Sequence, residues 1–342
     1  MKKMVLYRVD GGKVWGISMG HIRRSLLVAD AFSETCRVIF VMKNYPDGVA
    51  YVRAAGYQVE TIRVDDDSDG TIIALCEKYA PQRIIFDLYA NPYTRLFDYA
   101  RTKTVESVVF DILGKCVGIP DILINDSFVK DFVSYPHMDG RTKKYLGPAY
   151  FIMDKCPEFV PIRSEVRDVM ITMGGSDPAG LTTRVLRCLV GEREQRKGLR
   201  ICVVLGQLFT ERDAVRRLAE RSESVIIHEN PSNFLALLAG QDIVVTSGGR
   251  TLYECAYLGR PAVVLPSIDH EEATSSAYAT ATGSFDAGIW NEEQSPGKIW
   301  AAIERYRNDH SLRRSVSDSS RFLVDGGGMR RVLRLFGKKE VL

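Results

Sequence analysis

The sequence lacks the features that would place the chain in a membrane or on nucleic acid. No apolar run approaches the roughly 20 residues that a transmembrane helix requires. The apolar segment 4–9 is too short to serve as the core of a signal peptide. The formal net charge is only +3 over 342 residues, which gives no reason to expect a nucleic-acid partner. We therefore expect a cytoplasmic protein.

Metal-binding and disulfide motifs are also missing. The seven cysteines contain no C-x-x-C pair, so we expect free thiols in a reducing compartment. The three aspartates at 65–67 have polar neighbours, which predicts an exposed surface loop and not a metal clamp. The sequence accordingly predicts no metal site and no cofactor.

What the sequence does contain is a repeated alternation of apolar strands and amphipathic helices. The length predicts about two domains. In the first half, strands are expected at 4–9, 37–42, 58–62, 83–88, 107–110 and 121–124, and helices at 22–32, 47–55 and 71–79. Strands that read as near-continuous apolar runs between helices indicate a parallel sheet covered on both faces.

The alternation restarts after a segment at 154–163 that holds two prolines and no periodicity. Strands are then expected at 169–173, 200–205, 224–228, 242–246 and 262–265, and helices at 179–190, 211–221, 233–239, 271–282, 297–307 and 328–336. We predict an α/β protein with two Rossmann-like, doubly wound domains that face a central cleft. The expected boundaries are a domain at 1–155, a linker at 156–166, a domain at 167–325 and a C-terminal helix at 326–342.

The most informative segment is a glycine turn between an apolar strand and a helix in the second half. Ser247, Gly248 and Gly249 form this turn, and Arg250 and Thr251 follow it. Such a turn leaves backbone N–H groups free at a helix N-terminus, which suits a phosphate. Glu254 lies about one helical turn further on, where its carboxylate can accept hydrogen bonds from a ribose. The alternative is an ordinary strand-to-helix turn.

A second glycine turn opens the same half. Gly174, Gly175 and Ser176 follow its first strand, and the two glycines permit close approach of a diphosphate. Alternatively, Ser176 or Asp177 caps the next helix and Pro178 begins it.

A third loop, in the first half, runs from Asp10 to Gly20 and brings His21 to the start of a helix. The positive helix end disfavours imidazolium, so the ring is expected to be neutral and able to act as a base. The alternative is a solvent-exposed or helix-capping histidine.

These residues resemble a known superfamily. The pattern S-G-G-x-T-x-x-E-x-x-x-L-G-x-P at 247–261, with two Rossmann-like halves, resembles the MurG-like branch of the GT-B superfamily. The segments 7–10, 20–24 and 173–178 are similar to the UDP-sugar hydrolases of pseudaminic acid biosynthesis and to the related spore-coat polysaccharide proteins. The resemblance extends from about Val5 to about Gly288.

The resemblance implies a role for each matching residue. His21 would be the general base, Asp10 would shape its loop together with Arg8, and Tyr89 would line the sugar pocket. The residues expected to bind the substrate or its nucleotide are Arg8, Gly20, Arg24, Gly174, Gly175, Ser176, Ser247, Gly248, Gly249, Arg250, Thr251 and Glu254. Because Arg24 or Arg250 and the helix ends can stabilise the leaving diphosphate, no metal ion is required.

The resulting hypothesis is hydrolysis, with inversion, of a UDP-linked amino-deoxy sugar in surface-glycan biosynthesis. The alternative is a GT-B glycosyltransferase with a sugar or lipid acceptor. A third hypothesis is a nucleotide-sugar sensor without activity, or an inactive partner subunit. Ser18 and Leu88 stand where the hydrolases carry glycine and histidine, which favours the transferase. The arginines near the C-terminus indicate a solvated helix, or a peripheral membrane contact if the protein is a transferase.

Overall fold

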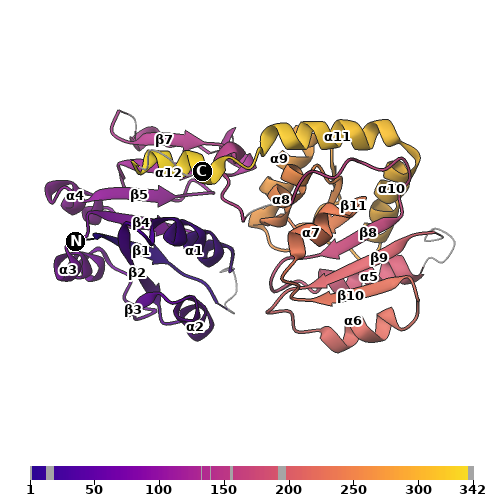
Figure 1. Ribbon diagram of the computed structural model, residues 1–342, viewed down its shortest axis with the longest axis horizontal. Coiled ribbons are helices and arrows are strands. Elements are labelled where there is room, and N and C mark those ends of the chain that lie inside the picture. Colours follow the sequence, from indigo (N-terminus) through magenta and orange to yellow (C-terminus); the bar gives the residue numbers. More distant parts are fainter. Residues whose placement is uncertain are drawn as a thin grey trace. The chain divides into compact units, whose positions relative to one another are not determined.

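The computed structural model describes residues 2–12, 19–131, 133–138, 140–154, 157–191 and 198–337 (Figure 1). The chain divides into two compact units. Unit 1 comprises Met1–Asp154 and Gly327–Leu342, and unit 2 comprises Lys155–Gly326. Parts of the prediction lie outside the described residues. These are Ser18, the start of the expected linker at 156 and the end of the expected C-terminal helix at 338–342. Within the described ranges, no helix is long and apolar enough to cross a membrane.

The core of unit 1 is a seven-stranded parallel sheet in the order β3-β2-β1-β4-β5-β6-β7. Its strands are β1 (Lys3–Val9), β2 (Cys36–Lys43), β3 (Gln58–Ile62), β4 (Arg83–Asp87), β5 (Glu106–Phe110), β6 (Ile122–Asn125) and β7 (Lys143–Leu146). The strand order reverses between β1 and β4. In open parallel sheets, ligands bind beside the carboxyl ends of the strands at such a reversal.

Helices cover both faces of this sheet. Helices α1 (Gly20–Phe32), α2 (Pro46–Ala54) and α12 (Gly328–Leu335) pack on one face, and α3 (Asp69–Tyr79) and α4 (Arg95–Thr102) pack on the other. The described residues of unit 1 also contain the short 3₁₀ helices η1 (Phe128–Asp131), η2 (Pro136–Met138) and η3 (Pro148–Tyr150). Side chains of β1 alternate between the two faces: Val5, Tyr7 and Val9 join one core and Leu6 joins the other.

Helix α12, yellow in Figure 1, follows unit 2 in the sequence but belongs to unit 1. Val332 and Leu333 enter the same core as α1, and Arg331 donates a hydrogen bond to the carbonyl of Ala149 at 2.8 Å. The helix begins at Gly328, where an added Cβ would lie 2.0 Å from the Phe151 carbonyl oxygen. Glycine at this position therefore allows the start of the helix to lie close to the backbone of Phe151.

Unit 2 is a second parallel sheet, with six strands in the order β10-β9-β8-β11-β12-β13. These are β8 (Asp168–Thr172), β9 (Arg200–Leu205), β10 (Val225–Glu229), β11 (Ile243–Thr246), β12 (Ala262–Val264) and β13 (Phe285–Asp286). The order reverses between β8 and β11, so the loops after these two strands lie at the place where such sheets bind ligands.

Two layers of helices enclose this sheet as well. Helices α5 (Leu181–Gly191), α6 (Arg212–Ala219) and α10 (Ser295–Asn308) share the larger core with one face. Helices α7 (Phe234–Ala239) and α8 (Thr251–Leu258) cover the other, and α11 (His310–Leu323) packs against both α8 and α9 (His270–Thr282). The predicted class, an α/β protein of two doubly wound parallel sheets, is confirmed.

Candidate functional site

In unit 1, the carboxyl ends of β1 and β4 bring together a histidine and an aspartate that are far apart in the sequence. Helix α1 begins at Gly20, so His21 lies in its first turn. The His21 Nδ1 atom is 2.6 Å from Oδ1 of Asp87, the last residue of β4. Since an ionised carboxylate only accepts hydrogen bonds, Nδ1 carries the proton and Nε2 is the nitrogen that can accept one. The side chain is 15% exposed and does not cap the helix, so neither alternative for His21 applies.

The Asp87 carboxylate is fixed by a buried arginine. Arg24 donates to both of its oxygens, at 2.6 and 2.7 Å, and to both oxygens of Asp126 at 2.8 Å. Burial raises the pKa of Asp87, but the charge of Arg24 and the contact with His21 outweigh it and hold that pKa well below its usual range. Asp87 is therefore ionised at neutral pH and orients the imidazole.

Arg24 requires a correction. We expected it to bind the leaving diphosphate, but its side chain is 3% exposed and is committed to Asp87 and Asp126. Its role in this structure is to neutralise two buried carboxylates. Asp87 ends β4 and Asp126 directly follows β6. Neither was predicted as a site residue, because the local sequence gives no sign that they converge on α1.

Arg8 also differs from the prediction. It has no exposed surface, and its guanidinium forms a bidentate ion pair with Asp10 at 2.7 Å and bonds to Asp67 at 2.8 Å. It therefore cannot reach a ligand from this position. Asp10 accepts a further hydrogen bond from the backbone N–H of Lys43 at 2.8 Å. The pair fixes the end of β1, where the loop toward His21 begins.

The expected surface loop at 65–67 is also more ordered than the sequence indicated. Asp67 is bound by Arg8 and by Lys43, whose Nζ lies 3.3 Å from Oδ2. Burial opposes ionisation of Asp67, but Arg8 lowers its pKa below the ordinary value. Asp65 remains exposed and pairs with its neighbour Arg63.

Tyr89 lies on the loop that follows β4, two residues after Asp87. It is 38% exposed, and its hydroxyl accepts a hydrogen bond from the Lys115 ammonium at 2.7 Å. Leu88, between the two, is buried. An exposed tyrosine beside a lysine provides one ring face and one cation for a polar ligand, and Lys115 was not predicted.

In unit 2, the turn after β8 is open on its glycine side. Gly174 has a φ of +77°, and a Cβ built on Gly174 or Gly175 would meet no atom within 4 Å. The turn is supported from below by Gly206, where a Cβ would lie 2.5 Å from the backbone of both glycines. The Gly174–Gly175 backbone is therefore accessible and held by close backbone packing.

The helix after this turn has an N-terminus that the chain itself caps. Helix α5 begins only at Leu181, and the Asp177 carboxylate accepts hydrogen bonds from the N–H groups of Leu181 and Thr182 at 2.9 and 2.7 Å. Asp177 itself adopts a φ of +44° to reach them. The capping alternative holds for Asp177, because these amides already have an acceptor. Ser176 lies half-buried in the turn.

The packing under this turn gives a stability prediction. Gly206→Ala forces a methyl group against the backbone of Gly174 and Gly175, and we expect it to destabilise the protein by about 1–3 kcal/mol. Gly191→Ala is the matched control, since a Cβ at that exposed helix end meets nothing. Urea unfolding of both variants measures the difference. Equal stability of the two variants would show that the close contact is not required.

The turn after β11 is partly occupied by the protein itself. Ser247 and Gly248 are buried, and the Gly248 N–H donates to Oε2 of Glu271, on α9, at 3.2 Å. The prediction that this amide is free for a phosphate is therefore wrong in this structure. Gly249 remains half-exposed. The N-cap residue of α8 is Arg250, and its side chain does not cap the helix.

Thr251 and Glu254 lie in the first turn of α8, as the sequence indicated. They are 7% and 5% exposed, so little of either side chain is open to solvent. Helix α8 ends at Gly259, which has the left-handed φ of +63° that a glycine cap provides.

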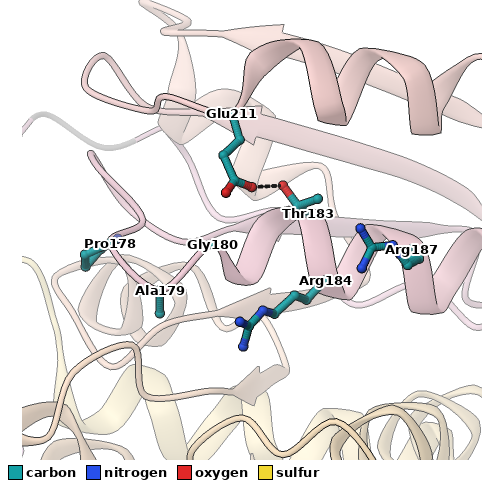
Figure 2. A pocket seen from close by; sticks show the side chains of 7 residues that line it. All are labelled: Pro178, Ala179, Gly180, Thr183, Arg184, Arg187 and Glu211. Carbon is teal, nitrogen blue, oxygen red and sulfur yellow. Dashed lines mark hydrogen bonds between the residues drawn. The ribbon is translucent and has the colours of Figure 1, made fainter.

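Beside the turn after β8, unit 2 contains a polar pocket that sequence analysis did not predict. It has a volume of about 260 Å³ and is lined by Pro178, Ala179, Gly180, Thr183, Arg184, Arg187 and Glu211. Figure 2 shows the Glu211 carboxylate turned toward Thr183, whose hydroxyl donates to it at 2.6 Å, and two arginines extending from α5. Its mixed charge does not point to one class of ligand.

Comparisons with known proteins agree with this architecture. No protein-family model matches the chain. The spore coat polysaccharide biosynthesis protein SpsG of Bacillus subtilis is 26% identical over 329 residues, which cover 94% of both chains. Among solved structures, MurG of Acinetobacter baumannii has a TM-score of 0.65 at 12% identity, with 98% of this chain and 99% of that chain covered. The rhamnosyltransferase SpnG, complexed with thymidine diphosphate, has a TM-score of 0.65 at 14% identity and coverage of 98% and 100%.

The chain has the MurG-like GT-B fold. The GT-B resemblance predicted from the sequence is thereby confirmed, and the similarity to SpsG extends over nearly the whole chain. Within this GT-B fold, unit 1 carries the His21–Asp87 pair and unit 2 carries the two glycine turns.

Proposed function

We propose that the chain is a glycosyltransferase that transfers a sugar from a nucleotide-sugar donor in polysaccharide biosynthesis. The observation that carries this proposal is the His21–Asp87 pair at the strand-order reversal of unit 1. It is supported by the similarity to a polysaccharide biosynthesis protein and by the GT-B fold shared with a rhamnosyltransferase.

In the proposed reaction, unit 1 supplies the base. The ionised Asp87 keeps the proton on Nδ1 of His21, and Nε2 removes a proton from an acceptor hydroxyl. The resulting alkoxide forms a bond to the anomeric carbon of the donor as the bond from that carbon to the diphosphate oxygen breaks. The electron pair leaves with the nucleoside diphosphate, and the single displacement inverts the anomeric centre.

Unit 2 is proposed to hold the donor. The accessible backbone at Gly174 and Gly175 and the start of α8 at Arg250 and Thr251 would contact the diphosphate. Glu254, about one helical turn further along α8, would accept hydrogen bonds from the ribose. The positive N–H ends of backbone dipoles beside the phosphate would stabilise the negative charge that develops on the leaving group.

The hydrolase hypothesis has less support. The proteins compared above include a rhamnosyltransferase and a polysaccharide biosynthesis protein, and none of these is named as a hydrolase. The leucine at the position where the resembling hydrolases carry a histidine is buried and has no group for proton transfer. We therefore take a sugar hydroxyl, and not water, as the proposed nucleophile.

Product analysis tests this proposal. We expect the purified chain to release nucleoside diphosphate from UDP-, dTDP-, CDP- or GDP-linked sugars when a sugar or polyprenyl-phosphate sugar acceptor is added. Mass spectrometry should then find the acceptor heavier by one glycosyl group. Release of free sugar at the same rate without an acceptor would establish the hydrolase. Binding of a donor without turnover in any acceptor mixture would leave a sensor.

A further inference from the structure

The turn after β11 is held by a carboxylate from another part of unit 2. Glu271 lies in the first turn of α9, and its Oε2 accepts hydrogen bonds from the Gly248 N–H at 3.2 Å and from both the N–H and the hydroxyl of Ser267 at 2.8 Å. These three donors belong to the two loops that follow β11 and β12. The Glu271 Oε2 atom thus accepts the hydrogen bond of the Gly248 N–H, which a phosphate would be expected to accept.

The contact is built into the packing of α9 against the turn. A Cβ at Gly248 would lie 2.6 Å from the Glu271 Cβ and 2.8 Å from its carbonyl oxygen. The second carboxylate oxygen, Oε1, would lie 3.4 Å from a Cβ on Gly249. Because neither glycine has a side chain, the backbone and the carboxylate of Glu271 can lie in direct contact with the turn.

The partners that hold Glu271 in this position are neutral donors, and a second carboxylate is close enough to affect it. Burial raises the pKa of Glu271, its hydrogen bonds to Ser267 and Gly248 lower it, and the charge of Asp177 raises it further. The charged or titratable side chains on the elements around α9 are Asp177 before α5, Arg250 at the N-cap of α8 and Glu254 within it, Asp269, His270 and Glu272 beside Glu271, His310, Arg313, Arg314, Asp318 and Arg321 on α11, and Asp286 on β13. A phosphate entering the turn meets the Glu271 charge at short range.

We propose that Glu271 is an internal anion that occupies the Ser247–Gly249 turn and has to leave it, or lose its charge, when a donor diphosphate binds. The inference rests on the proposed nucleotide-sugar donor. It makes donor binding a competition between two anions for one backbone amide. Binding is then coupled to the uptake of a proton by Glu271 or to the rotation of its side chain.

Substitution by an uncharged isostere tests the competition. Glu271→Gln keeps an acceptor for Ser267 and Gly248 and removes the charge, and we expect it to bind UDP-, dTDP-, CDP- or GDP-glucose about tenfold more tightly than the wild type. Glu272→Gln, at the exposed next position, is the matched control and should not change the affinity. Isothermal titration calorimetry on the full chain gives both constants.

The pH dependence provides a second measurement. These donors are diphosphate diesters, so their own charge stays constant between about pH 5 and 8, whereas a free terminal phosphate titrates near pH 6. Lowering the pH protonates Glu271 and should tighten donor binding to the wild type, because the competing charge disappears. Asp177 and His270 are present in both proteins, so the difference between the wild-type and Glu271→Gln profiles reports Glu271 alone.

The outcomes separate this inference from the proposed function. Equal affinity and equal pH profiles for the wild type and Glu271→Gln would overturn the inference and leave the donor assignment standing. Failure of both proteins to bind any of the four donors would overturn both. Ser267→Ala, which loosens the carboxylate, should also tighten binding. If Glu271 only ties the loops together, both variants should instead bind more weakly and melt at lower temperature.

Discussion

His21→Ala is expected to reduce kcat by about 10²- to 10⁴-fold, the contribution usual for a positioned general base. The substitution removes the imidazole nitrogen that is proposed to accept the proton of the attacking hydroxyl. The Kd of the nucleotide-sugar donor should stay nearly unchanged, because the groups proposed to bind the nucleotide belong to unit 2. Steady-state rates with the acceptor, together with calorimetric donor binding, measure the two quantities separately.

The control for this variant is His310→Ala, which removes an exposed histidine from the start of α11 in unit 2. It should retain full activity. If His21→Ala lowered donor affinity as much as it lowered turnover, the assignment of the base to unit 1 and of the nucleotide to unit 2 would be wrong. If His21→Ala kept the wild-type kcat, His21 would not be the base.

Arg24→Ala is expected to have the largest effect on stability, a loss of about 3–5 kcal/mol, because it leaves two buried carboxylates without their cation. Asp87 is fully buried, Asp126 is 2% exposed, and Arg24 donates two hydrogen bonds to each. Urea unfolding at neutral pH measures the loss. Arg23→Ala removes the neighbouring residue on α1, whose ion pair with Asp154 is largely exposed, and should cost no more than about 1 kcal/mol.

The destabilisation should depend on pH in a defined direction. In the wild type the folded-state pKa of Asp87 lies below its unfolded value, so the stability that its ionised form contributes is complete above the unfolded pKa and is lost as the pH falls. Without Arg24 that contribution is gone. The difference between wild type and variant should therefore be greatest at neutral pH and shrink in acid. A constant difference across this range would show that packing, and not charge, accounts for the loss.

The elements of the fold were predictable where apolar periodicity and turn residues agree. The sequence predicted β11 and the glycine turn that leads into α8. The helix His310–Leu323 was missed, because only Val316 and a few polar side chains of this helix are buried and its sequence is rich in serine and arginine. Helix α4 was also missed, because its eight residues are too few to show a clear helical periodicity of apolar residues.

The site was predictable only where a single segment carries the signal. His21 stands next to a glycine at a helix start, and this could be recognised locally. Asp87 is separated from it by 66 positions, and only the parallel pairing of β1 with β4 brings the two together. The same holds for Glu271, which stands at the start of the helix expected at 271–282. It does bond to Ser267, but its contact with Gly248 depends on how α9 packs against the turn.

The return of α12 to the first sheet has a consequence for the order in which the protein matures on the ribosome. The chain passes from unit 1 to unit 2 near residue 155 and back near residue 327. Every residue of unit 2 has been synthesised before Val332 and Leu333, which fill the core beneath α1, are added. Because domains generally fold as units during translation, the lobe that is started first is completed last.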